Sequence, residues 1–176
     1  MAGRQAGGLH NAAMSDPASA LEASQLTPAG QLEEGDLLRL VGYQLAQAQI
    51  VTDAVFAAEV GSGLDLRQIE FTVLALVARN PGLTASELAN ALAVTPPYIA
   101  SCLDKLLRRG LIQRLQSPLD RRAMHIHVTA AGGDMVHSAT QRLLARERQS
   151  LDALSTAERL MLAELLHKAA SCRRPG

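Results

Sequence analysis

The order of elements within residues 84–128 constrains the fold of this chain more than any other feature. The capping box Thr84-Ala85-Ser86-Glu87 predicts a short helix, because a hydroxyl and a carboxylate at this spacing satisfy the amides at a helix start. After a tight turn, Thr95-Pro96-Pro97 predicts a second helix, since proline is tolerated in the first helical positions. Residues 111–115 and 124–128 follow as two predicted strands. We therefore predict two short helices followed directly by a β-hairpin.

The segment before these elements is predicted to contain two more helices. Apolar residues at spacings of three and four predict a helix over 36–60, which Gly61-Ser62-Gly63 should break. Asp65-Leu66-Arg67-Gln68 is interpreted as a capping box whose first residue caps a helix, and Asn80-Pro81-Gly82 should end that helix. Residues 1–34 show no such periodicity, and we expect them to form a flexible tail.

Two further helices are predicted after the hairpin. Thr129 should cap a long helix that runs towards Leu151, and Ser155-Thr156-Ala157-Glu158 should open a final one. Hydrophobic residues make up 48% of the chain but aromatic residues only 2%, so the core must be built from aliphatic side chains. The predicted fold class is mainly α with a small β-hairpin.

The composition favours a reducing, aqueous environment. The two cysteines, Cys102 and Cys172, are too few for a disulfide framework. The chain has no apolar run of membrane-spanning length and no apolar stretch typical of a signal peptide. We therefore expect a cytoplasmic protein.

Positive charge gathers in one part of a chain whose formal net charge is zero. Residues 105–122 hold one anion, Asp120, and six cations: Lys105, Arg108, Arg109, Arg114, Arg121 and Arg122. Such a run is usually a solvated face, but this one covers the second short helix and the hairpin. A helix of this kind fits the major groove of DNA, and a hairpin beside it reaches the neighbouring backbone or minor groove. The arrangement predicts a winged helix-turn-helix that binds double-stranded DNA.

Three motifs resemble the signature of the MarR (multiple antibiotic resistance regulator) family. They are Gly110-Leu111-Ile112 with Arg114, then Asp120-Arg121-Arg122, then the run from Val128 to Gly132. The resemblance extends from about Asp36 to Ala170. It implies a dimeric winged-helix regulator that binds pseudo-palindromic DNA, often released by a small effector.

The resemblance also implies roles for two residues of the hairpin turn. Arg122 matches the arginine at the tip of the wing that enters the minor groove, and Asp120 matches the acid that orients it. A planar guanidinium suits a narrow, negative minor groove. The alternative is a plain turn with an exposed ion pair.

In the second short helix, Ile99, Leu103 and Leu106 should face the core. The complementary face then offers side chains to DNA. Together with the hairpin, the predicted contacts are Thr95, Pro96, Tyr98, Ser101, Lys105, Arg114, Asp120, Arg121 and Arg122. Alternatively, Thr95 only caps the helix, and Tyr98 and Ser101 touch phosphate rather than bases. The pair Pro96-Pro97 is an unusual opening for a recognition helix of this family.

The first and last helices, which lie outside the winged core, should form the interface of a homodimer. The predicted regions are a tail (1–34), an N-terminal dimerisation helix (35–64), the DNA-binding region (65–128) and C-terminal dimerisation helices (129–171). We expect a repressor released by a small effector, which the family resemblance suggests is aromatic or phenolic. Tyr43 and Gln47 are candidate effector contacts.

Other chemistry finds little support in the sequence. We expect Cys102 to be a buried apolar residue rather than a redox sensor. His125 and His127 share a strand face but have no further ligand cluster, so we predict no metal and no cofactor. No nucleophile and base are paired, so we predict no enzyme. The remaining alternative is a protein-interaction module that has lost DNA binding, which would have no need for Arg122.

Overall fold

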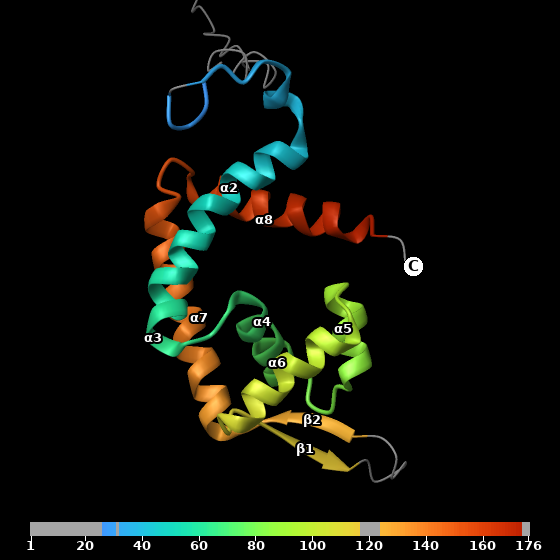
Figure 1. Ribbon diagram of the computed structural model, residues 1–176. Helices are drawn as coiled ribbons and strands as arrows, with labels where there is room; N and C mark the ends of the chain where they lie inside the picture. Colours follow the sequence, from blue (N-terminus) through green and yellow to red (C-terminus); the bar gives the residue numbers. More distant parts are fainter. Residues whose placement is uncertain (1–25, 31, 117–123, 174–176) are drawn as a thin grey trace, which may run out of the picture. The chain divides into compact units, whose positions relative to one another are not determined.

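The computed structural model describes residues 26–30, 32–116 and 124–173. The chain divides into two compact units, residues 1–49 and 50–176, and helix α2 (Val41–Phe56) crosses from one to the other. Each unit is described by itself. The described elements are mainly helices, with one antiparallel hairpin, as predicted (Figure 1).

In the first unit, the predicted helix over 36–60 proves to be interrupted. A 3-10 helix, η1 (Gly35–Arg39), comes first, and Leu40 then adopts an extended conformation before α2 begins. The extended residue explains why the periodicity does not correspond to one helix. Before η1, Leu26 and Glu33 form an isolated β-bridge.

The predicted break at Gly61-Ser62-Gly63 is wrong. In the second unit the chain continues from α2 through a π-helical turn, η2 (Ala57–Gly61), into a short helix, α3 (Ser62–Leu64). Helical structure ends only at Asp65, which has a left-handed φ of 47°. The guanidinium of Arg109 donates to the carbonyls of Leu64 and Asp65 at 2.8 and 3.0 Å, and so satisfies acceptors at this helix end.

Helix α4 (Gln68–Arg79) begins later than predicted. Its N-cap residue is Arg67, not Asp65, and the carboxylate that reaches back to the N-cap amide is that of Glu70, at 2.9 Å. The predicted capping box at 65–68 is therefore wrong. The helix ends before Asn80 as predicted.

The helix-turn-helix follows the predicted pattern. Helix α5 (Ala85–Leu92) starts at the capping box of Thr84 and Glu87, and helix α6 (Pro96–Arg108) starts at Thr95. The turn between them passes through Ala93, which has a left-handed φ of 51°. The amide of Val94 donates to the carbonyl of Ala89 at 3.1 Å and closes the turn.

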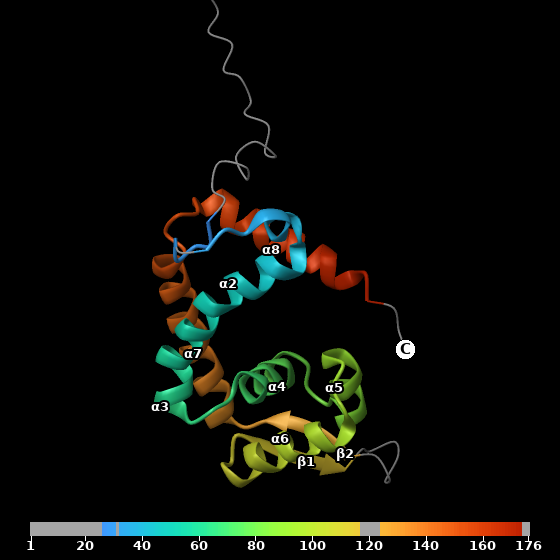
Figure 2. The same cartoon turned by 45° about the horizontal axis from the view of Figure 1, so that its top comes forward.

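Strands β1 (Ile112–Gln116) and β2 (Met124–Val128) form the predicted hairpin, with Ile112 opposite Val128. Ile126 also pairs with Leu83, a contact that the sequence did not predict. The two views place the hairpin beside α6 (Figure 1, Figure 2). The hairpin is thereby tied both to α6 and to the segment before α5.

Helix α7 (Ala130–Ser150) is fixed to the hairpin at its first turn. The hydroxyl of Thr129 accepts from the amide of Gly132 at 3.1 Å and donates to the carbonyl of Gly110 at 2.7 Å. A Cβ atom on Gly132 would lie 2.1 Å from the carbonyl oxygen of Leu111, so only glycine fits there. Helix α8 (Thr156–Ser171) then starts at the predicted capping box of Ser155 and Glu158.

The core is aliphatic, as the composition predicted. It joins α4, α5, α6, the hairpin and α7, and its members include Val73, Leu74, Val77, Leu88, Ile99, Leu103, Leu106 and Ile126. Phe56 and Phe71 form a tilted aromatic pair packed against it, with ring centroids 5.9 Å apart. Among the described helices, none combines the length and apolar character that a membrane span requires.

Candidate DNA-binding interface

Helix α6 has one buried side and one exposed side. Four residues have no exposed surface: Ile99, Cys102, Leu103 and Leu106. On the opposite side, four exposed residues at spacings of three and four form a continuous stripe: Pro97, Ser101, Asp104 and Arg108. The predicted core residues are thus confirmed as buried. The exposed stripe is the surface that α6 can present to a partner.

The leading end of α6 is also exposed. Thr95 occupies the N-cap position, but its hydroxyl makes no capping hydrogen bond. In contrast, the hydroxyl of Thr84 accepts from the amide of Glu87 at 3.3 Å at the start of α5. Pro96 is exposed next to Thr95. The interpretation of Thr95 as only a cap therefore has no support in the described contacts.

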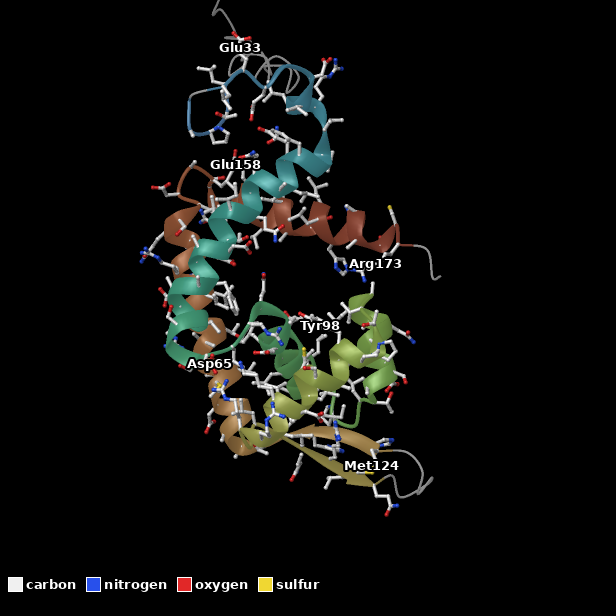
Figure 3. All side chains as sticks on the ribbon, in the orientation of Figure 1. Glu33, Asp65, Tyr98, Met124, Glu158 and Arg173 are labelled. Atoms are coloured by element: carbon white, nitrogen blue, oxygen red, sulfur yellow. The ribbon has the colours of Figure 1, made fainter. Side chains whose placement is uncertain are left out.

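Lys105 lies beside the exposed stripe and turns towards the start of α4. Its ammonium lies 3.1 Å from the Glu70 carboxylate and 3.4 Å from the Asp65 carboxylate, and it donates to the Asp65 carbonyl at 2.9 Å. Figure 3 shows Asp65 on the segment that precedes α4. The predicted DNA contact Lys105, whose side chain is 28% exposed, therefore forms ion pairs within the protein that link α6 to α4.

Glu70 is a buried carboxylate that the sequence analysis did not single out. It has no exposed surface, and it accepts from the amide of Arg67 at 2.9 Å and from Nε of Arg67 at 2.6 Å. Burial raises the pKa of Glu70, but the hydrogen bonds from Arg67 and Lys105 outweigh it, so the pKa lies below its ordinary value. The sequence did hold a signal for this burial. Glu70 lies three and four positions before the core residues Val73 and Leu74, and residues at these spacings share a helix face.

Arg114 on β1 forms an ion pair with Asp104 on α6, with a distance of 3.0 Å between Nη2 and Oδ1. Both side chains are substantially exposed, at 38% and 53%. Exposed ion pairs contribute little stability, so this pair mainly sets the orientation of the guanidinium. The sequence analysis named Arg114 as a DNA contact, which stays a prediction, but it did not foresee the ion pair with Asp104. The two residues meet only when the hairpin folds against α6.

Residues 117–123, which connect the two strands in the sequence, lie outside the described residues. Asp120, Arg121 and Arg122 are among them, and their predicted roles stay predictions. The described strands stop at Gln116 and resume at Met124. The hairpin therefore supplies the base of a wing beside α6.

Comparison with known proteins identifies this arrangement. The sequence profile of the MarR family matches residues 66–124. The multiple antibiotic resistance protein MarR of Salmonella typhimurium is 31% identical over 107 residues, which cover 61% of this chain and 74% of that protein. The chain belongs to the MarR family. It is accordingly a winged-helix transcriptional regulator, and the MarR family is not enzymatic.

Two solved structures of the MarR fold extend the comparison. The transcriptional repressor CouR, bound to a 23-mer DNA duplex, matches with a TM-score of 0.71 and 31% identity over 80% of this chain and 99% of that chain. The Mycobacterium tuberculosis MarR family protein Rv2887, in complex with salicylic acid, matches with a TM-score of 0.60 and 28% identity over 74% and 96%.

The candidate effector residues of this MarR-family chain, Tyr43 and Gln47, lie in the first unit. The hydroxyl of Tyr43 donates to the Glu34 carboxylate at 2.7 Å, and this bond raises the pKa of Tyr43, with Gln47 nearby. The cavity, of about 370 Å³, belongs to the second unit. It is lined by Ile50, Val51, Ala54, Val55, Ala58, Arg146 and Ser150. Tyr43 and Gln47 do not line it.

The structure also places the cysteine and the two histidines that were considered as redox or metal-binding residues. Cys102 is fully buried on the core side of α6, and burial raises the pKa of its thiol, which favours the unreactive form. His125 and His127 are half-buried on β2. Within the described part of the chain, no three histidine, cysteine or acidic side chains are grouped as metal ligands.

Proposed function

We propose that this MarR-family regulator is a dimeric repressor that binds a pseudo-palindromic operator and is released by a small acid. The observation that carries the proposal is the exposed side of α6 beside the hairpin, opposite a side with no exposed surface. A helix held rigidly by one face can enter the major groove with the other. The DNA-bound repressor CouR, which shares the fold, supports this docking.

The proposed DNA contacts fall into two groups. In α6 they are the leading-end residues Thr95 and Pro96 together with Tyr98 and Ser101, which are all exposed. In the wing they are Arg114, Asp120, Arg121 and Arg122. Lys105 is left out of this set because two carboxylates already hold its ammonium.

Helix α8 supports a dimer. None of its residues is buried in the single chain. Five large apolar side chains on it are exposed: Leu160, Met161, Leu162, Leu165 and Leu166. So many exposed large apolar side chains on one helix favour an interface, because leaving them in water is unfavourable. A second copy of the chain would bring two α6 helices to successive major grooves.

The cavity between α2 and α7 supports an acidic effector with an apolar body. Its lining is aliphatic except for Ser150 and Arg146. An aliphatic wall suits a ring, and a guanidinium pairs with a carboxylate. The related protein Rv2887 in complex with salicylic acid supports this ligand class. An effector that prefers the DNA-incompetent form must weaken DNA binding.

The test is a gel-shift titration on the DNA upstream of the protein's own gene, with and without salicylate. We expect binding that salicylate weakens, and we expect Arg146→Gln to bind DNA normally but respond less to salicylate. Absence of binding by the folded wild-type protein would contradict the proposed function. Equal responses of wild type and Arg146→Gln would contradict the proposed effector site alone.

A further inference from the structure

The side chain of Arg67, at the start of α4, lies next to Tyr98 near the start of α6. The guanidinium carbon of Arg67, the N-cap residue of α4, lies 5.8 Å from the centroid of the Tyr98 ring on α6. The Arg67 side chain is 56% exposed and Tyr98 is 39% exposed. A cation over an aromatic ring is attracted by the negative face of the ring. The two side chains therefore meet at the surface of the protein (Figure 3 labels Tyr98).

The buried carboxylate of Glu70 holds Arg67 in place. It accepts from the backbone amide of Arg67 at 2.9 Å and from Nε at 2.6 Å, so both the main chain of Arg67 and the inner nitrogen of its guanidinium are engaged. Among the described residues, no hydrogen bond from either Nη group of Arg67 is found. The outer edge of the guanidinium is thus oriented and available to a partner in solvent.

We propose that Arg67 and Tyr98 together bind one backbone phosphate of the DNA, with Glu70 as the residue that positions Arg67. This inference rests on the proposed function, in which α6 lies in the major groove. Tyr98 lies on the flank of α6 rather than on its exposed stripe, and a flank faces the phosphates that line the groove. A guanidinium and a phenol hydroxyl match the charge and the acceptor oxygens of a phosphate. Helix α4 thereby adds a DNA contact from outside the recognition helix and the wing.

The test is operator binding by the full-length protein across a salt series. Arg67→Gln should lower the affinity and reduce the slope of log K against log salt by up to about one, because one phosphate contact is lost. Tyr98→Phe keeps the ring and removes only the hydroxyl, so the affinity should fall about threefold to tenfold with little change of slope. The matched control is Arg148→Gln, an exposed arginine near the end of α7, which should change neither quantity.

Folding is controlled separately, because Arg67→Gln leaves the Glu70 carboxylate with fewer partners. The double variant Arg67→Gln/Glu70→Gln removes that charge, and its salt slope should stay reduced while circular dichroism shows that it is folded. In the Arg67→Gln background, Tyr98→Phe should also cause a smaller loss of affinity than in the wild type, because both residues bind the same phosphate.

Three results would count against the proposal. A folded Arg67→Gln/Glu70→Gln protein with wild-type affinity and slope would overturn it, as would fully additive effects of Arg67→Gln and Tyr98→Phe. In either case, loss of binding in Ser101→Asp in the same experiment would show that the proposed function stands and that only this inference fails. If the wild-type protein does not bind the operator, both fail.

Discussion

Glu70 on α4, which has no exposed surface, lies 3.1 Å from the ammonium of Lys105 on α6. The start of one helix is thus tied to the middle of the helix that we propose reads DNA. Removing one partner of a buried pair is far more damaging than the net stability of the pair suggests, because the remaining charge loses its compensation. This relationship makes stability and DNA binding separable at neighbouring residues of α6.

Glu70 should make the stability depend on pH. Its pKa in the folded protein lies below the ordinary value of 4.5, so its stabilising contribution is present above that value and is lost as the pH falls through the folded pKa. We expect Glu70→Gln to destabilise the protein at pH 7 by about 1–3 kcal/mol. The difference from wild type should shrink below pH 4.5. Urea unfolding of both proteins across this range is the measurement, and a constant difference would contradict the assignment.

Lys105→Met should act on folding rather than on the electrostatics of DNA binding. The substitution keeps the length of the side chain but removes the charge that faces Glu70 and Asp65. We expect a lower unfolding temperature and an unchanged salt slope of operator binding. A slope reduced by about one in a protein of wild-type stability would instead indicate a phosphate contact.

Gly132 and Gly133 offer a matched pair at the junction of the wing and α7. A Cβ on Gly132 would lie 2.1 Å from the Leu111 carbonyl oxygen, whereas a Cβ on Gly133 would have no atom within 4 Å. Gly132→Ala should therefore destabilise the protein by about 1–3 kcal/mol or more. Gly133→Ala should be neutral or stabilising by up to about 1 kcal/mol, since alanine is the better helix former. Similar effects in chemical unfolding would contradict the described junction.

The exposed leucines of α8 should control association. Leu162→Ser combined with Leu165→Ser removes apolar surface that the single chain leaves 38% and 54% exposed. We expect sedimentation to show a shift from dimer to monomer, together with weaker operator binding. Lys168→Ala is the control on the same helix, because it breaks only the exposed ion pair with Glu164. A dimer that survives the double substitution would contradict the proposed interface.

Local signals explain most of the fold that the sequence predicted. The helices that start at Thr84, Thr95, Thr129 and Ser155 each begin at a capping residue or a proline, and all four starts are confirmed. The two failures have different causes. At α4 the capping carboxylate is that of Glu70, three residues after Arg67, so a local signal was assigned to the wrong residues. The helical path through Gly61-Ser62-Gly63 instead ends at carbonyls that the distant Arg109 satisfies.

The candidate site shows the same division. Helical periodicity was enough to separate Ile99, Leu103 and Leu106 from the exposed side of α6. It could not separate Lys105 from Ser101, because both lie on the polar side of the helix and only tertiary contacts with α4 distinguish them. The pairing of Arg67 with Tyr98 likewise requires two helices to be packed together.

The central claim is that α6 and the wing bind DNA, and operator titration of Arg122→Ala across a salt series tests it most directly. Arg122 lies outside the described residues, and we predict that it enters the minor groove. The affinity should fall, and the salt slope should decrease by up to about one unit. Asp120→Asn should lower the affinity with little loss of slope, because the charge of Arg122 remains. Circular dichroism controls for folding. Wild-type affinity and slope in a folded Arg122→Ala protein would contradict the account.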